Sequence, residues 1–136
     1  MMLINEFAHQ TNLPAKTIRY YEEIGLLPPA RRLENGYRDY DSGDVARARF
    51  VAAARSLDLS LDDVQEILAL RDQREAPCRV LLEMLANKAD EISRRIAQLQ
   101  QLETELRALY QLGQTFPTDD VDGKNCVCHL VEERLD

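Results

Sequence analysis

The sequence predicts a mainly α-helical chain in which an N-terminal winged helix-turn-helix is followed by one long coiled-coil dimerisation helix. Two short helical segments flank a tight turn near the start, and an Asn35-Gly36 pair lies between two short segments of alternating character. Residues 79–112 then repeat apolar side chains at heptad spacing without a glycine or proline. Together these patterns favour helices throughout, with strands only around the Asn-Gly turn.

The first two helices are expected on either side of the segment "QTNLP", residues 10–14. Apolar side chains at positions 3, 4, 7 and 8 follow helical spacing, and Pro14 suits the first turn of a second helix over about 14–24. Gly25 is a typical helix-stop residue, and the prolines after it cannot continue a helix. In the second helix Ile18 and Tyr21 are expected on a buried stripe. The outward positions are Lys16, Thr17, Arg19 and Glu23.

A two-stranded wing is expected around Asn35-Gly36, because this dipeptide is the strongest local signal for a two-residue hairpin turn. The turn would leave one short strand before it and one after it, each exposing side chains to solvent. The wing residues of interest are Arg32, Tyr37, Arg38 and Tyr40.

Three helices are predicted after the wing, and the last is much the longest. The first two extend over about 42–57 and about 61–73, and Ser60 with Asp63 three residues later is a capping-box signature for the second. The third, residues 79–112, has a heptad seam with one three-residue slip, formed by Leu82, Leu85, Ala89, Ile92, Ile96, Leu99, Leu102, Leu106 and Leu109. A single helix cannot bury this seam against itself, and no second segment of comparable length is predicted. We therefore expect a homodimer, parallel or antiparallel, and predict the antiparallel coiled coil.

The net charge of −7 is spread unevenly along the 136 residues. Residues 1–60 carry eight basic and eight acidic side chains, so residues 61–136 hold the whole acidic excess. Within residues 11–38, five basic side chains stand against three acidic ones, a local charge of +2. A DNA-facing surface needs local rather than global positive charge. The distribution is therefore compatible with a small DNA-facing patch on an acidic body.

The sequence shows no signal for export or for a membrane span. Its start, "MMLINEFAHQ", lacks a basic segment followed by an apolar one, and no run approaches the roughly 18 apolar residues that a span requires. A cytoplasmic location is expected, where thiols stay reduced. The three cysteines are then more often buried, metal-binding or redox-active than disulfide-bonded.

The ensemble of "TIRYYEEIGLL", "RLENGYRDY", two more helices and a long dimer helix resembles the MerR family, bacterial regulators with a winged helix-turn-helix. The resemblance extends over essentially the whole chain and is strongest across residues 3–73. It implies a homodimer on double-stranded promoter DNA whose spacer is too long for RNA polymerase, and an effector that makes the protein bend and untwist that DNA. The expected parts are the DNA-binding domain with its two following helices (1–73), a linker and dimerisation helix (74–112), and an effector-binding loop with a short C-terminal helix (113–136).

The DNA-binding residues are expected on the second helix and the wing. A short helix after a tight turn can enter the major groove, while a wing positions the protein on the flanking backbone. The candidates are Lys16, Thr17, Arg19, Tyr20, Arg32, Tyr37 and Arg38. A solvated helix face is the alternative for any single arginine. Core packing is the expected role of Tyr20, Tyr21 and Tyr40, and for Tyr20 a hydroxyl contact with phosphate is the alternative.

The resemblance also suggests a metal site. In metal-sensing members, a cysteine at the start of the dimer helix approaches the loop after the partner's dimer helix. Cys78 holds that first position, as in the divalent-metal sensors, whereas members responding to monovalent copper, silver or gold tend to have serine there. Burial near a helix N-terminus would favour its thiolate. With Cys126 and Cys128 of the other protomer, Cys78 would form a thiolate set attractive to Cd(II), Pb(II), Hg(II) or Zn(II).

The tail "DGKNCVCHLVEER" departs from the family pattern in one respect. The family's first loop cysteine, at the end of the dimer helix, has no counterpart in "YQLGQTFP", and Cys128 best matches the second loop cysteine. Cys126 either replaces the missing ligand or is a bystander. His129 is either a fourth ligand or, in the favoured interpretation, a solvent-facing or capping residue.

Other interpretations of the chain compete with metal sensing. A regulator of the same build could sense thiol oxidation or an organic electrophile through Cys126 and Cys128. A coiled-coil adaptor without DNA function would leave "KTIRYYEE" and the Asn-Gly wing unexplained, and an iron–sulfur centre would need four clustered cysteines. An enzyme is not expected, because His9 and His129 lie at opposite ends of the chain and no glycine-rich phosphate loop is present.

Overall fold

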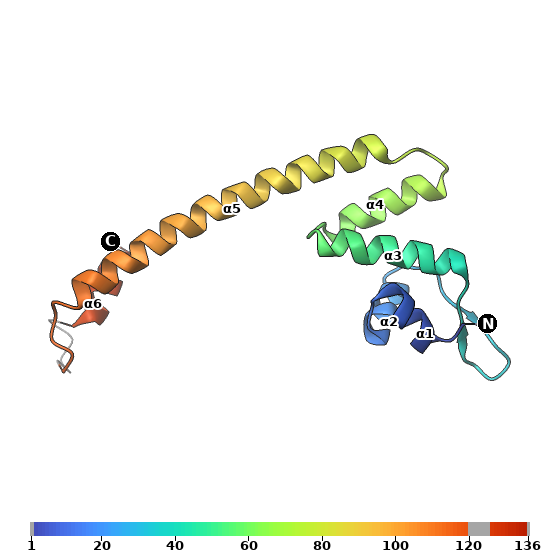
Figure 1. Ribbon diagram of the computed structural model, residues 1–136, viewed down its shortest axis with the longest axis horizontal. Helices are drawn as coiled ribbons and strands as arrows, with labels where there is room; N and C mark the ends of the chain where they lie inside the picture. Colours follow the sequence, from blue (N-terminus) through green and yellow to red (C-terminus); the bar gives the residue numbers. More distant parts are fainter. Residues whose placement is uncertain (1, 120–125, 136) are drawn as a thin grey trace. The chain divides into compact units, whose positions relative to one another are not determined.

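The computed structural model describes residues 2–119 and 126–135, and its elements follow the predicted order (Figure 1). They are α1 (Ile4–Thr11), α2 (Ala15–Glu23), β1 (Arg31–Arg32), β2 (Arg38–Asp39), α3 (Ser42–Ser56), α4 (Leu61–Asp72), α5 (Cys78–Gly113) and α6 (Val127–Glu133). The predicted fold class is confirmed: the chain is mainly helical, with a two-stranded wing and one long helix towards the C-terminus. Part of the expected effector loop, residues 120–125, lies outside the described residues. Two compact units are distinguished, residues 1–88 and residues 89–136.

The turn between α1 and α2 depends on Asn12, which ends α1 in the left-handed conformation with φ of 59°. Asparagine tolerates this region better than most residues, and the amide after it donates to the carbonyl of Ala8. Helix α2 ends at Glu23, and the predicted stop residue Gly25 follows its C-cap with φ of 82°. The next amide donates to the carbonyl of Tyr21 at 2.9 Å, which satisfies the end of the helix. The helix-turn-helix is therefore closed by two local backbone signals.

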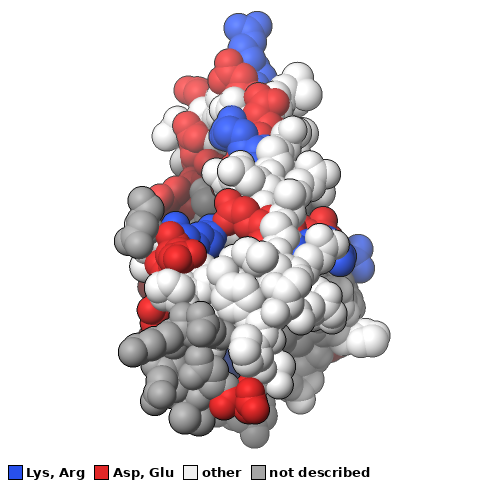
Figure 2. Space-filling view, turned by 90° about the vertical axis from the view of Figure 1, so that its left-hand side faces the viewer, with Lys and Arg blue, Asp and Glu red and all other residues white. Residues whose placement is uncertain are grey.

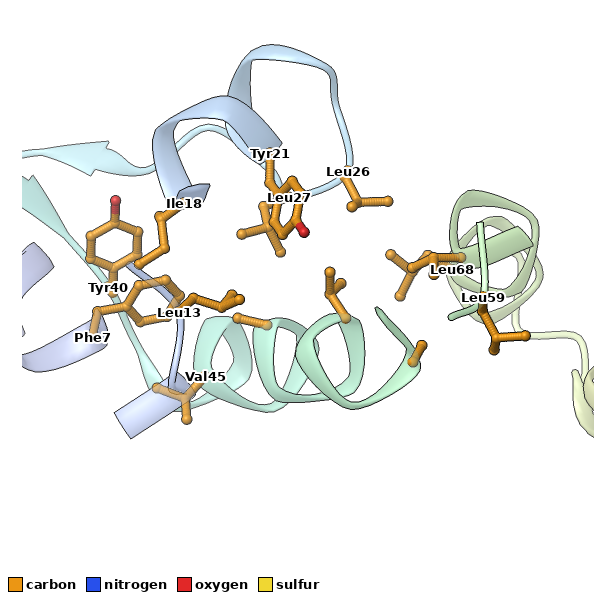
Figure 3. Close-up of a cluster of buried hydrophobic side chains, with 14 residues drawn as sticks. Phe7, Leu13, Ile18, Tyr21, Leu26, Leu27, Tyr40, Val45, Leu59 and Leu68 are labelled. Atoms are coloured by element: carbon orange, nitrogen blue, oxygen red, sulfur yellow. The ribbon is translucent and has the colours of Figure 1, made fainter. Parts of the chain in front are cut away.

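A cluster of fourteen buried apolar side chains forms the core of residues 1–88 (Figure 3). Ile18 and Tyr21 contribute from α2, as predicted, at 0% and 7% exposure. Tyr40 also packs in this cluster, with its ring stacked on Phe7 at a centroid distance of 3.9 Å. The expectation of core packing is wrong for Tyr20, which is 48% exposed. Ile18 and Tyr21, three residues apart, occupy the inward face of α2, and Tyr20 points about 100° away from Tyr21.

The wing is a short antiparallel pair in which Arg32 lies opposite Arg38. Its turn contains Gly36 with φ of 85°, a conformation that strains residues with a side chain. The N-terminal segment lies against the wing, because the amide of Tyr40 donates to the carbonyl of Met2 at 2.9 Å. The predicted Asn-Gly hairpin is therefore present and is tied to the start of the chain.

Helices α3 and α4 both begin with a capping box. At α4 the amide of Asp63 donates to Ser60 Oγ at 3.0 Å, and the Asp63 carboxylate accepts from the amide of Ser60, as predicted. Helix α3 begins in the same way with Asp41 and Asp44, a start signal that the sequence analysis did not single out. Each box satisfies two backbone amides that a helix otherwise leaves unpaired.

Helix α5 has 36 residues, and at 1.5 Å per residue it is about 54 Å long. Near its start, Leu81 and Met84 pack against the core of residues 1–88. Most large side chains of the predicted seam are instead 39–67% exposed: Leu82, Leu85, Ile92, Ile96, Leu99, Leu102 and Leu106. Leu109, the last of the seam, is half-buried. Within the described residues of one chain the seam is therefore largely uncovered. Along those same residues, no helix combines the length and apolar character needed to cross a membrane.

Candidate nucleic-acid interface and thiol site

Helix α2 presents a polar face built from the predicted residues. Lys16, Arg19 and Tyr20 are exposed, and Thr17 is half-buried. The opposite face of the helix is anchored in the core by Ile18, so α2 is fixed while its polar face stays free. This is the geometry a recognition helix needs to meet a DNA groove.

The wing carries the other predicted DNA-binding residues. Arg32 is exposed and donates from Nη1 to the carbonyl of Gly36 at 2.9 Å, which braces the turn. Tyr37 is 61% exposed, and its amide donates to Asn35 Oδ1 at 3.1 Å. Arg38, in contrast, is half-buried. The structure thus leaves Arg32 and Tyr37 free to contact a ligand, whereas part of Arg38 is engaged inside the protein.

A groove of about 360 Å³ lies between the start of α1, helix α2 and the wing. Three arginines line it: Arg19 of α2, Arg32 of β1 and Arg38 of β2. The remaining lining residues are Leu3, Ile4, Asn5, Gly36 and Tyr37. Guanidinium groups bind phosphate through paired N–H donors, so this groove suits the backbone of a nucleic acid. The sequence predicted all three arginines but not that they share one groove.

Glu22 is a site residue that the sequence analysis did not single out. Its Oε2 accepts from Arg38 Nε at 3.1 Å, and its Oε1 accepts from the hydroxyl of Tyr40 at 2.6 Å. The side chains of Glu22 and Arg38 are 11% and 23% exposed. Burial raises the pKa of Tyr40, and the hydrogen bond to Glu22 raises it further. No sequence pattern relates Glu22 to partners 16 and 18 residues away.

The cysteines occupy two helix starts. Cys78 is the first residue of α5, Cys126 is the N-cap of α6, and Cys128 lies in the first turn of α6. All three are free thiols; Cys126 is half-buried, while Cys78 and Cys128 are exposed. The expected burial of Cys78 is therefore not found in the chain, because its side chain precedes the turns of α5 that pack on the core.

Cys126 and Cys128 lie two residues apart at the start of α6. A hydrogen bond between the two thiols, reinforced by the charge of Cys126, raises the pKa of Cys128. Among residues 2–119 and 126–135, no three histidine, cysteine, aspartate or glutamate side chains converge to hold a metal ion. One chain therefore supplies a thiol pair at α6, with the third predicted thiol at the opposite end of α5.

Helix α6 packs against the C-terminal end of α5. Leu130 of α6 is 8% exposed, and a Cβ added at the buried Gly113 would lie 3.2 Å from Val127 Cγ2. Arg134 pairs with Glu105 of α5 across the same contact. The thiol pair is therefore placed by packing rather than left on a free tail.

The side chain of His129 faces solvent. Its Nε2 lies 3.0 Å from Glu133 Oε1, one turn further along α6, and both side chains are about half exposed. This agrees with the favoured interpretation of His129 as a solvent-facing residue.

In Figure 2, which views the molecule from the side of α6, acidic side chains are spread over the surface with basic ones between them.

These features define a winged helix-turn-helix protein with an arginine-lined groove and a thiol pair at the end of a long helix. Residues 2–70 match the family described as "MerR HTH family regulatory protein", and residues 45–109 match "MerR, DNA binding". The chain belongs to the MerR family of helix-turn-helix regulatory proteins.

Relatives in this family resemble the chain over most of its length. It is 39% identical to the HTH-type transcriptional regulator HmrR of Rhizobium leguminosarum bv. viciae, over 79% of this chain and 83% of that protein. It is 38% identical to the heavy metal-dependent transcription regulator 2 of Rhizobium meliloti, over 97% of this chain and 85% of that protein. Among solved structures, the lead(II) complex of the transcription regulator PbrR691 from Ralstonia metallidurans superposes with a TM-score of 0.77 at 28% identity. The superposition covers 96% of this chain and 99% of that protein.

Proposed function

We propose that this chain is a homodimeric transcription regulator that binds promoter DNA and responds to a thiophilic metal ion. The DNA contacts are assigned to Lys16, Thr17, Arg19 and Tyr20 of α2, and to Arg32, Tyr37 and Arg38 of the wing. The three-arginine groove supports this assignment, because it offers phosphate donors from both elements. Its location is the cytoplasm, where promoter DNA is found and the three free thiols stay reduced.

The dimer is assigned to the exposed seam of α5. Each large apolar side chain of this seam gains about 1.5–3 kcal/mol when it is buried. In an antiparallel pair, the start of one α5 lies beside the end of the other. Because α5 is about 54 Å long, the Cys78 that can approach a given Cys126 and Cys128 is then that of the partner subunit.

The effector is assigned to the soft divalent ions Cd(II), Pb(II), Zn(II) and Hg(II). The observation that carries this assignment is the placement of Cys126 and Cys128 together at the start of α6, which packs on the end of α5. Cys78 of the partner subunit completes a three-thiol donor set, and sulfur donors select soft ions over hard ones. The heavy metal-dependent regulator and the lead(II) complex among the relatives support the same chemistry.

The output is activation of a metal-resistance promoter by distortion of its DNA, so that RNA polymerase can use it. Bending a promoter-sized duplex costs about 1–6 kcal/mol. Thiolate coordination in structural zinc sites is worth about 10–16 kcal/mol, so binding that differs between the two DNA conformations by a fraction of this amount is enough to shift that equilibrium. The protein's own part is to join the effector site to the DNA-binding unit through the continuous helix α5.

The direct test is an ultraviolet titration of the reduced protein with Cd(II), Zn(II), Pb(II), Hg(II) and Cu(I). We expect stoichiometric thiolate-to-metal charge transfer that weakens in Cys78→Ser, Cys126→Ser and Cys128→Ser. His129→Gln is the matched control, because His129 adjoins the pair but faces solvent. If no such band forms and Cys126 and Cys128 oxidise readily instead, the effector is an oxidant on the same DNA-binding frame.

Mixing two variants that each lack part of the site tests whether the site is shared between subunits. Cys78→Ser keeps the thiol pair, and Cys126→Ser/Cys128→Ser keeps Cys78. A heterodimer of the two contains one complete shared site, so we expect the three-thiol band to rise above that of either variant alone, to at most half the wild-type intensity per dimer. A band that stays at the level of the unmixed variants after subunit exchange would contradict the shared site.

A further inference from the structure

Glu22 connects the recognition helix to the wing through both oxygens of one carboxylate. We propose that Glu22 is a positioning residue for DNA binding, which holds β2 against α2 so that both elements meet one duplex together. The inference rests on the DNA-binding role proposed above. In this proposal Glu22 itself does not contact DNA.

The two partners of Glu22 lie on one face of one short segment. Arg38 and Tyr40 are two residues apart, and side chains at this spacing point to the same side of a strand. Glu22 Oε1 accepts from Tyr40 at 2.6 Å, and Glu22 Oε2 accepts from Arg38 at 3.1 Å. Two bonds to neighbouring positions restrain both the distance of the wing from α2 and its rotation about the strand.

The Tyr40 side of this connection is itself rigid. Tyr40 is 5% exposed, and its ring stacks on Phe7 of α1 with an interplanar angle of 6°. Figure 3 shows its hydroxyl directed away from the Phe7 ring. Because burial raises the pKa of Tyr40, the hydroxyl keeps its proton and remains a donor to Glu22. The wing is therefore fixed to α1 by stacking and to α2 by the carboxylate.

The charge of Glu22 opposes DNA binding, which makes a substitution there diagnostic. Glu22 lies with Arg19 and Arg38 beside a second hollow at this surface, and a carboxylate here repels phosphate. Removing the charge alone should tighten DNA binding. Removing the positioning role should weaken it. The two roles of Glu22 thus predict changes in DNA affinity of opposite sign.

Glu23 provides a matched control on the same helix. It is exposed, lines the same hollow, and makes no hydrogen bond or ion pair in the described part of the chain. Glu23→Gln removes the same charge as Glu22→Gln without touching the wing. Tyr40→Phe removes only one of the two hydrogen bonds and keeps the stacking on Phe7.

The first experiment measures amide hydrogen exchange of the full chain without DNA. In Glu22→Gln we expect amides of residues 31–39 to exchange about ten-fold faster, equivalent to about 1.4 kcal/mol of lost local protection, while α3 and α4 are unchanged. Tyr40→Phe should act in the same direction with a smaller effect, and Glu23→Gln should match wild type. Unchanged wing protection in both Glu22→Gln and Tyr40→Phe would overturn the positioning role.

The second experiment measures fluorescence anisotropy with a duplex selected from a random-sequence library on the wild-type protein. We expect Glu22→Gln to weaken binding about ten-fold and to make the salt dependence shallower, because wing phosphate contacts are lost. Partial unfolding would instead lower the active fraction without changing that slope. Glu23→Gln should bind as well as wild type or better. Equal or tighter binding by Glu22→Gln would overturn the inference.

A double-mutant cycle separates this inference from the proposed DNA contacts. In an Arg32→Ala background, Glu22→Gln should cause a smaller further loss of affinity than in wild type, since it acts through the placement of the wing that carries Arg32. Full additivity of the two losses would count against positioning. If Arg32→Ala alone leaves affinity unchanged, the proposed contact of Arg32 is wrong, and the exchange experiment still decides whether Glu22 fixes the wing.

Discussion

Residues 1–88 bury their apolar side chains in a cluster of fourteen, whereas the described part of residues 89–136 leaves most of its large apolar side chains exposed. In the first unit, polar groups also find partners within the chain, as at the capping boxes and at Glu22. In the second, the seam of α5 is uncovered and the thiol pair has no third ligand among the described residues. The core of the first unit is thus complete within one chain, whereas the seam, which begins at Leu82 in the first unit and continues through the second, has the features of half an interface.

The largest expected effect comes from placing a charge in the seam of the second unit. Leu99 is 64% exposed in the chain, and Leu99→Asp would bury a carboxylate in the proposed dimer. Two lost leucine contacts, at about 1.5–3 kcal/mol each, raise the dissociation constant of the dimer about 100-fold or more. Sedimentation over a concentration series should therefore show a monomer.

The neighbouring Gln98→Asp is the control for this change, because it adds the same charge off the seam. We expect it to remain dimeric. Leu99→Asp should also lose the three-thiol absorption band, since its monomer lacks Cys78 of the partner subunit. A dimer of normal affinity in Leu99→Asp would mean that the seam is not the interface.

A core substitution in the first unit should destabilise that unit without affecting dimerisation. Ile18 is fully buried in the cluster, and Ile18→Ala removes its side chain and leaves a cavity. Such truncations cost about 2–5 kcal/mol of unfolding free energy. Chemical denaturation should show the loss, while Lys16→Ala on the exposed face of the same helix should change stability little. Loss of the dimer together with stability in Ile18→Ala would contradict the independence of the units.

Local signals explain which parts of the fold could be predicted from the sequence. The Ser60–Asp63 box, the Asn-Gly turn and the stop at Gly25 each depend on residues a few positions apart, so a short stretch contains the whole interaction. The seam of α5 could be predicted from the sequence for the same reason. The apolar pair Leu81 and Met84 has the same helical spacing but packs on the core, and only the tertiary fold distinguishes the two faces.

The candidate site was less predictable because its geometry is non-local. Residue type and position were enough to place Lys16, Arg19 and Arg32 on exposed surfaces. They were not enough to show that Arg38 is paired with Glu22, sixteen residues away. The exposure of Cys78 was also missed, since it depends on where α5 begins to pack on the core rather than on the residue itself.

A bulky side chain at Gly113 should disturb the second unit alone. Gly113 is buried, and even a Cβ there would approach Val127 Cγ2 to 3.2 Å. Gly113→Leu should push α6 off α5, with an overpacking cost of about 1–3 kcal/mol. Amides of α6 should exchange faster and metal should bind the thiol pair more weakly. Gly113→Leu/Val127→Ala should recover part of both effects, and unchanged metal binding in Gly113→Leu would show that the packing of α6 does not place the thiols.

The smallest expected effect is a pH-dependent one at the start of α3 in the first unit. The amide of Asp44 donates to Asp41, whose carboxylate also pairs with Arg31 at 2.6 Å, and these contacts lower the pKa of Asp41. A carboxylate with a lowered folded-state pKa stabilises the protein above its unfolded pKa of about 3.9, and this contribution is lost as the pH falls through the folded-state value.

Asp41→Asn keeps a good N-cap but carries no charge. Its melting temperature should lie slightly below that of wild type at neutral pH, and the two should converge as the pH falls below about 3.9. A difference that persists unchanged into that acidic range would show that Asp41 acts through its shape as a cap rather than through its charge.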